Sequence, residues 1–242
     1  MDNTSISHLL VYSFTAISSY YISLYTQSSI SAIFLGWSIY GFTTIGHDLL
    51  HKPTKINKMI SFYCMDTLII NSEYWILYHN KYHHKDLQGD TDIMKLKGDT
   101  LLEEWYYLLE VCGGGSPIDH IYRLPFYYLL YNLRWFQILE VYFTVLFCLA
   151  YFTYITHSHS IESKYPKNSI QHNLDNTLDI FPSSKFINLL FGGINCHATH
   201  HCYPTCGRSN LYEKSKYLAK TYPEHYRSIN TIKELYILYR YR

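Results

Sequence analysis

A run of 45 residues without a charged side chain constrains the fold more than any other feature of the chain. No Asp, Glu, Lys or Arg occurs between Asp2 and Asp48. One helix of that length would extend roughly 68 Å at about 1.5 Å per residue, more than twice the roughly 30 Å hydrocarbon thickness of a bilayer. We therefore expect two membrane crossings, at 8–26 and 29–45. A buried helical hairpin of a soluble protein is the alternative, because Ser and Thr are frequent in both halves.

Histidines gather in three separated clusters. The clusters are His47 and His51, then His79, His83 and His84, and finally His197, His200 and His201. If residues 79–84 are α-helical, His79 and His83 lie one above the other and His84 lies one step round the helix. Three rings could then converge on one metal ion. A solvated histidine-rich loop is the alternative for any single cluster.

The later apolar stretches predict two further crossings. The interior of 138–156 carries no charge and is expected to span the bilayer. The stretch 121–133 is short and contains Arg123 and Pro125. It is nevertheless needed, because the second and third clusters can share one site only if the chain between them crosses an even number of times. Residues 59–78 fit a helix lying along the membrane surface or against the protein better than a crossing.

Basic residues place the clusters on one side of the membrane. Of the 20 Lys and Arg residues, Arg123 and Arg134 flank the short span, and the other 18 (20 minus 2) lie in the segments that carry the second and third clusters. The positive-inside tendency assigns those segments to the cytoplasm. We expect an all-α, multi-pass integral membrane protein of about four transmembrane helices in two hairpins, with a cytoplasmic helical cap carrying the clusters. The membrane would be the endoplasmic reticulum or a bacterial-type inner membrane.

The clusters predict a transition-metal site. Imidazole ligands suit iron, copper, nickel or zinc better than magnesium or calcium. Asp48 is placed to accept a hydrogen bond from a ligating ring, and Asn168 and His172, four residues apart, add an amide and an imidazole on one helix face. Nine histidines are too many for one tetrahedral ion, but two ions with open positions could use them. They are His47, His51, His79, His83, His84, His172, His197, His200 and His201.

These residues and their neighbours resemble the three histidine boxes of the membrane fatty-acid desaturase superfamily. These neighbours are Gly46-His47-Asp48 in the first box, Trp75, His79-Asn80 and Gly89-Asp90-Thr91-Asp92-Ile93 around the second, and Gly192-Gly193-Ile194-Asn195 and Pro204 around the third. The Asn168 and His172 element resembles the extra asparagine and histidine of acyl-CoA desaturases. The resemblance covers roughly residues 36–212 of one desaturase-like domain, 1–242.

The resemblance implies an O2-dependent di-iron oxidoreductase that introduces a double bond into a fatty-acyl chain. The nine histidines would bind two iron ions, Asn168 would bind directly or through water, and Asp48, Asp90 and Asp92 would support the ligands. The substrate would be an acyl lipid or acyl-CoA, with O2 as co-substrate. The sequence has no His-Pro-Gly-Gly of a fused cytochrome b5, no GxGxxG and no CxxCH. A separate donor such as cytochrome b5 or a ferredoxin is therefore implied.

Other functions stay open on the same residues. A hydroxylase or ketolase of a lipid or carotenoid would use the same scaffold, and a non-catalytic metal-binding membrane protein or an inactive relative is a further alternative. A zinc site at Cys196, Cys202 and Cys206 would leave two histidine clusters without a role. The net charge of +1 gives no indication of the basic surface that a nucleic-acid-binding protein usually has. The histidines expected to have no catalytic role are His8, His120, His157, His159 and His225, with His157 and His159 expected at the membrane interface.

Overall fold

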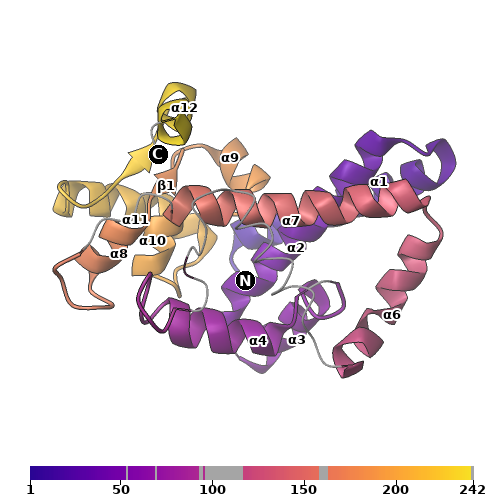
Figure 1. Ribbon diagram of the computed structural model, residues 1–242, viewed down its shortest axis with the longest axis horizontal. Helices are drawn as coiled ribbons and strands as arrows, with labels where there is room; N and C mark the ends of the chain where they lie inside the picture. The colour runs from indigo at the N-terminus through magenta and orange to yellow at the C-terminus, as the bar shows by residue number, and fades with distance from the viewer. Residues whose placement is uncertain (53, 69, 93–94, 96–116, 158–162, 241–242) are drawn as a thin grey trace.

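Three long helices form the body of the protein (Figure 1). The computed structural model describes residues 1–52, 54–68, 70–92, 95, 117–157 and 163–240. The helices α1 (Asn3–Thr26) and α7 (Trp135–His157) both pack against α2 (Ser29–Leu50). The position of α2 between them places the first histidine cluster at the centre of the molecule.

Shorter elements surround these helices. In chain order they are α3 (Lys55–Cys64), α4 (Ser72–Trp75), η1 (Ile76–His83), α6 (Pro117–Tyr131), α8 (Ile170–Asn176), β1 (Asp179–Ile180), α9 (Lys185–Leu190), α10 (His197–Cys202), α11 (Arg208–Thr221), β2 (Ser228–Ile229) and α12 (Ile232–Arg240). The two short strands pair in parallel. The described part of the chain is therefore mostly helical, as the sequence predicts.

The charge-free run forms two helices with a sharp turn between them. Asp2 caps α1, because its Oδ1 accepts a hydrogen bond from the Ser5 backbone N–H at 2.8 Å. Gln27 ends α1 in the left-handed region, with φ of 54°, a conformation that closes helices at their C-terminal end. The second helix then continues past the predicted end at 45, so α2 carries His47 on its last full turn.

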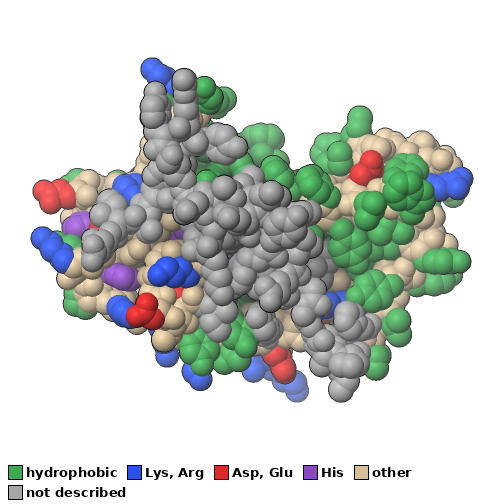
Figure 2. Space-filling model, in the orientation of Figure 1, with side chains coloured by type: hydrophobic (Ala, Val, Ile, Leu, Met, Phe, Trp, Pro, Cys, Tyr) green, Lys and Arg blue, Asp and Glu red, His purple; other side chains and the backbone are tan. Residues whose placement is uncertain are grey.

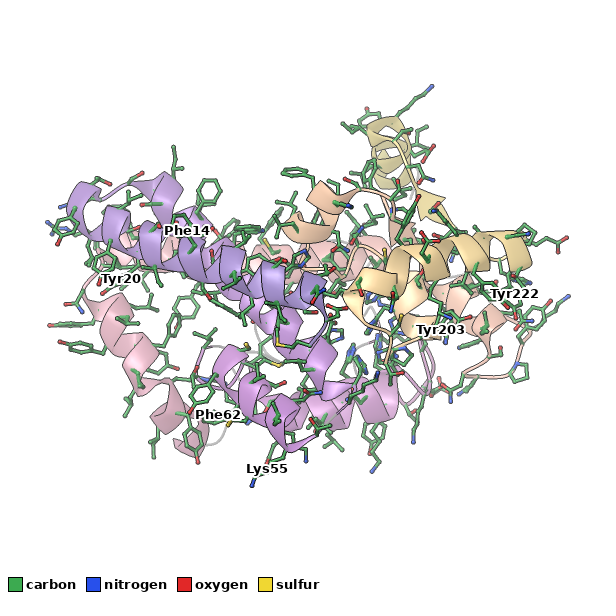
Figure 3. All side chains as sticks on the ribbon, turned by 180° about the vertical axis from the view of Figure 1, so that it is seen from behind. Phe14, Tyr20, Lys55, Phe62, Tyr203 and Tyr222 are labelled. Carbon is green, nitrogen blue, oxygen red and sulfur yellow. The ribbon has the colours of Figure 1, made fainter. Side chains whose placement is uncertain are left out.

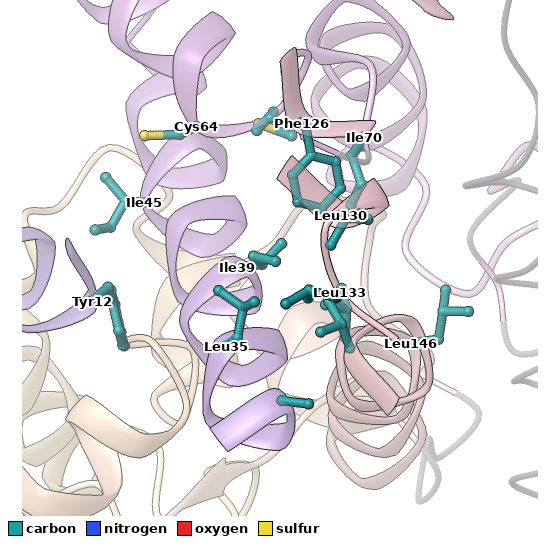
Figure 4. Packing of buried hydrophobic residues seen from close by; sticks show 14 of the residues in the cluster. Tyr12, Leu35, Ile39, Ile45, Cys64, Ile70, Phe126, Leu130, Leu133 and Leu146 are labelled. Atoms are coloured by element: carbon teal, nitrogen blue, oxygen red, sulfur yellow. The ribbon is translucent and has the colours of Figure 1, made fainter. Parts of the chain in front are cut away.

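A hydrophobic core packs against α2 (Figure 4). Leu35 and Ile39 of α2 belong to the same buried cluster as Phe126 and Leu130 of α6. Gly36 allows α2 and α7 to approach closely, because a Cβ there would lie 2.7 Å from the Val141 carbonyl oxygen. This packing fixes α2 and α7 side by side, which determines where the histidine-bearing ends of the two helices meet.

Two of the four predicted crossings are long and apolar enough to span a membrane. Within the described residues these are Ser29–Leu50 and Trp135–His157. Helices α1 and α6 occupy the other two predicted stretches without meeting that test, so the four-crossing topology stays a prediction. Helix α1 does carry exposed apolar side chains, among them Phe14 at 74% exposure (Figure 3).

Hydrophobic and charged side chains are distributed unevenly over the surface. On the face shown in Figure 2, hydrophobic side chains gather at the end where α6 and the start of α7 lie, and charged side chains are more numerous at the other end. The predicted surface helix at 59–78 is not continuous. Helix α3 ends at Cys64, and α4 begins only at Ser72.

Candidate metal centre

Nine histidines meet where α2, η1, α7 and α10 converge. They form two groups, in each of which one ring nitrogen per residue lies within 4.8 Å of every other. The five-histidine group contains His47, His51, His79, His84 and His200. The four-histidine group contains His83, His157, His197 and His201. Every one of these residues is buried or half-buried.

The second cluster divides between the groups because its helix is not an α-helix. Residues Ile76–His83 form a π-helix, and the His84 backbone N–H donates to the His79 carbonyl five residues earlier at 3.0 Å. Residues five apart therefore share a face here. The α-helical expectation paired His79 with His83, whereas the structure pairs His79 with His84 and turns His83 toward the other group.

Neighbouring histidines in α10 divide in the same way. His200 joins the five-histidine group and His201 joins the four-histidine group. Adjacent residues of a helix point in directions about 100° apart. In a His-His pair that lies between two sites, one ring can therefore point into each site. The pairs His83-His84 and His200-His201 thus link the two groups through single peptide bonds.

The Nε2 atoms of several rings face one another. In the five-histidine group, the His47 Nε2 lies 2.7 Å from that of His79 and 3.3 Å from that of His51. In the four-histidine group, the His197 Nε2 lies 2.8 Å from that of His157 and 3.1 Å from that of His201. Close-packed ring nitrogens of this kind form a ready ligand set for a cation.

Two carboxylates fix which ring nitrogen carries the proton. The His47 Nδ1 lies 2.8 Å from Asp48 Oδ1, and the His83 Nδ1 lies 2.9 Å from Asp92 Oδ2. Because a carboxylate accepts, both Nδ1 atoms carry hydrogen and each Nε2 keeps its lone pair for a metal. The Trp75 ring also stacks on His79 at 4.7 Å between centroids, which restrains the orientation of that ring.

The electrostatics of the site favour neutral imidazoles. Burial lowers the pKa of His200 to about 3, helped by the neighbouring His47 ring. Burial and adjacent histidines also hold the pKa values of His197 and His201 well below the usual range. Neutral rings with free lone pairs are the form that binds a transition metal. The residues present therefore fit metal ions in both groups.

His157 lies in the four-histidine group, and His172 lies outside both groups. Helix α7 continues to His157 and delivers its ring to His197. The His172 ring instead makes a hydrogen bond between Nε2 and the Leu87 carbonyl at 3.1 Å. The sequence predicts an interfacial position and no catalytic role for His157. Its place at the end of a predicted crossing is the signal that could have put it beside the histidine clusters.

Other predicted site residues lie away from the rings. Asn168 is exposed in the turn before α8, with φ of 66°, and Asp90 is exposed in the turn before Asp92. The thiols of Cys196 and Cys202 lie near the backbone carbonyls of Pro182 and Ile170. Among the described residues, no cysteine belongs to either metal-ligand group.

A cavity of about 50 Å³ adjoins both groups. Its lining includes Tyr40 and Thr44 from α2, Leu149 and Phe152 from α7, and five of the nine histidines. The Thr44 hydroxyl is bonded to the Gly41 carbonyl within its own helix, so it does not seek a partner in the cavity. The space would hold only a few water-sized groups, directly against the rings.

One family model matches part of the chain. No curated protein matches this sequence. Residues 119–233, just under half of the chain, match the family model described as "Fatty acid desaturase". The matched segment contains His157 and the third histidine cluster, whereas the first two clusters lie before it. The match confirms the resemblance to the membrane fatty-acid desaturase superfamily, whose members are desaturase- or oxygenase-type enzymes.

Proposed function

We propose that this protein is an O2-dependent membrane oxidoreductase that introduces a double bond into a fatty-acyl chain. The observation that carries the proposal is the pair of histidine groups beside one cavity. Two iron ions would be held, one by the five-histidine group and one by the four-histidine group. When bound, they would supply the electron-transfer chemistry needed to use O2 and to remove hydrogen from an unactivated CH2 group.

The protein's own side chains would hold this chemistry in place. Asp48 and Asp92 keep the proton on Nδ1 of His47 and His83, which directs the lone pair of each Nε2 inward. The stacked Trp75 ring restrains His79. Rings oriented in advance lose little freedom when they bind, and orientation is a large part of what a protein supplies to a cofactor.

The apolar surfaces along α2 and α7 support an acyl chain as the substrate. The small cavity at the rings lies between these helices. A second, apolar groove of about 710 Å³ follows the same helix pair, lined by Trp37 of α2, Phe143 and Phe147 of α7, and Phe186 of α9. An acyl lipid or acyl-CoA would lay its chain along this pair and bring one pair of methylenes to the histidines. Burial of CH2 groups favours such binding by about 0.8 kcal/mol each.

The proposal also implies partners outside the chain. A separate electron donor such as cytochrome b5 or a ferredoxin would have to reach the site from the cytoplasmic side. Three exposed lysines lie in this region, Lys52 between α2 and α3 and Lys55 and Lys58 in the first turn of α3. The expected location is the endoplasmic reticulum or a bacterial-type inner membrane, on the positive-inside argument.

Expression in a host of defined lipid composition tests the proposal. The purified protein is expected to contain two irons per chain, and mass spectrometry of the host lipids should show a product two hydrogens lighter. His83→Ala should abolish the product. His225→Ala is the matched control, because that ring bonds to Asp175 outside both groups. A product heavier by one oxygen would instead establish a hydroxylase or ketolase, and a protein without metal would refute the proposal.

A further inference from the structure

Asp48 links the His47 ring to a buried arginine from the far end of the chain. One oxygen of Asp48 accepts the hydrogen bond from His47 Nδ1 at 2.8 Å. The other oxygen lies 2.5 Å from the Arg208 Nε, across 160 residues of sequence. Both carboxylate oxygens are thus engaged, and Asp48 cannot rotate without breaking one of the two contacts.

Arg208 is itself buried and contacts a second residue besides the carboxylate. Its side chain is only 1% exposed, and a buried charge of this kind is stable only when it is paired and hydrogen-bonded. Its Nη1 also lies 3.2 Å from the Nδ1 of His8 in α1. Arg208 therefore connects the start of α11 to α1 and to the end of α2.

A glycine leaves the space that the arginine occupies. Gly193 adopts φ of +83°, and a Cβ at that position would lie 2.9 Å from both Cδ and Nε of Arg208. Most residues would be strained in this backbone conformation, and any side chain would displace the guanidinium from Asp48. The glycine before the third histidine cluster thus shapes the slot for Arg208.

We infer that Arg208 is a positioning residue for the five-histidine group, acting through Asp48 on the His47 ring. Histidine ligands depend on the acceptor behind them, and losing that acceptor commonly weakens metal binding about 10- to 100-fold. Here the acceptor is itself fixed by a guanidinium, whose planar donors set the direction of the carboxylate. The inference rests on the proposed function in one respect, namely that the two groups bind metal.

Equilibrium titration of metal into chelator-stripped protein tests this role. Cobalt(II) is a suitable probe, because its visible absorption reports ligand geometry and its binding can be followed in competition with a chelator of known affinity. The wild type is expected to bind two equivalents. Arg208→Met and Asp48→Asn should each weaken one equivalent by about 10- to 100-fold and alter its absorption while leaving the other equivalent unchanged. The double variant should be no weaker than the weaker single variant, since both act through one path.

Arg227→Met provides the matched control. Arg227 is half-buried, donates to the carbonyls of Leu174 and Asp175, and is not a member of either histidine group. This variant should lower the melting temperature and keep both cobalt affinities. If Arg208→Met does not fold, Arg208→Lys replaces it, since one ammonium cannot reproduce both contacts and should weaken the same equivalent to a smaller degree.

Two results would overturn the inference alone. The first is a wild type and an Arg208 variant that bind both equivalents with the same affinity. The second is an Arg227→Met variant that loses cobalt as Arg208→Met does, which would make the effect a general loss of structure. A wild type that binds no metal would instead refute the proposed function, and the inference would fail with it.

Discussion

His157 offers the sharpest test of the site, because the structure places it in the four-histidine group. Its Nε2 lies 2.8 Å from that of His197, and its ring centroid lies 5.1 Å from that of His83 and 5.3 Å from that of His201. His157→Ala would leave three rings for one metal ion. The backbone of α7 would keep its helical bonds, and besides the ligand the change would remove the 3.4 Å contact between the His157 Nδ1 and the Asn176 carbonyl.

The size of the effect follows from the number of ligands. Structural metal sites with four ligands are stabilised by about 10–16 kcal/mol, or about 2.5–4 kcal/mol for each ligand if the four contribute equally. A tenfold change in affinity corresponds to about 1.4 kcal/mol. Loss of His157 is therefore expected to weaken one metal equivalent by about 10²- to 10³-fold and to leave the other unchanged.

His172→Ala is the natural comparison. The His172 ring has one hydrogen bond to the Leu87 carbonyl at 3.1 Å, so its loss should cost about 1 kcal/mol of stability and no metal. Metal per chain and affinity, measured by competition with a chelator, separate the two variants. The opposite pattern, with metal lost from His172→Ala and kept in His157→Ala, would refute the grouping of the rings described here.

Three further results are expected. Burial lowers the pKa of His200 to about 3, so below about pH 6.5 the unfolded chain binds a proton that the folded chain excludes. The free energy of unfolding of the metal-free protein should therefore fall by about 1.4 kcal/mol per pH unit for each such histidine as the pH falls below about 6.5. A melting temperature that stays constant between about pH 7.5 and 5.5 would contradict this. Asp92→Asn should weaken the four-histidine group by about 10- to 100-fold in the same competition assay, because it removes the charge behind His83; unchanged affinity would show that the contact does not orient the ring. Asp179→Asn should reduce the free energy of unfolding by about 1–3 kcal/mol and so lower the melting temperature. The reason is that Asp179 accepts hydrogen bonds from the backbone N–H and the hydroxyl of Thr199 at 3.1 and 2.6 Å. An unchanged melting temperature would argue against a role in holding α10.

The helices of the body could be predicted because their signals are local. The absence of charge from Asn3 to His47 favours two apolar helices, and the turn at Gln27 divides the run where bilayer thickness suggests. The three histidine clusters could likewise be assigned to one site, because their spacing repeats. Helix α6 carries a weaker signal for a membrane crossing, because it is short and contains Pro125.

The details of the site depend on contacts that sequence spacing does not encode. His157 has no neighbouring cluster, and only the packing of α7 beside α10 brings its ring to His197. The π-helix at Ile76–His83 is equally hidden, because one extra residue in a turn leaves no mark in a histidine spacing that also fits an α-helix. Nothing in the sequence distinguishes Arg208 from the other basic residues after the third cluster. Its contact with Asp48, 160 residues away, exists only in the folded chain.

The two His-His pairs have a consequence for how the centre responds to movement. Because His83-His84 and His200-His201 each reach both groups, the separation between the two metal positions is set by bonded neighbours about 3.8 Å apart at Cα. A tilt or slide of η1 or α10 would carry both positions together as a unit. If both groups bind metal as proposed, thermal motion of the long helices would change the distance between the centre and a substrate while preserving the distance between the two metal positions.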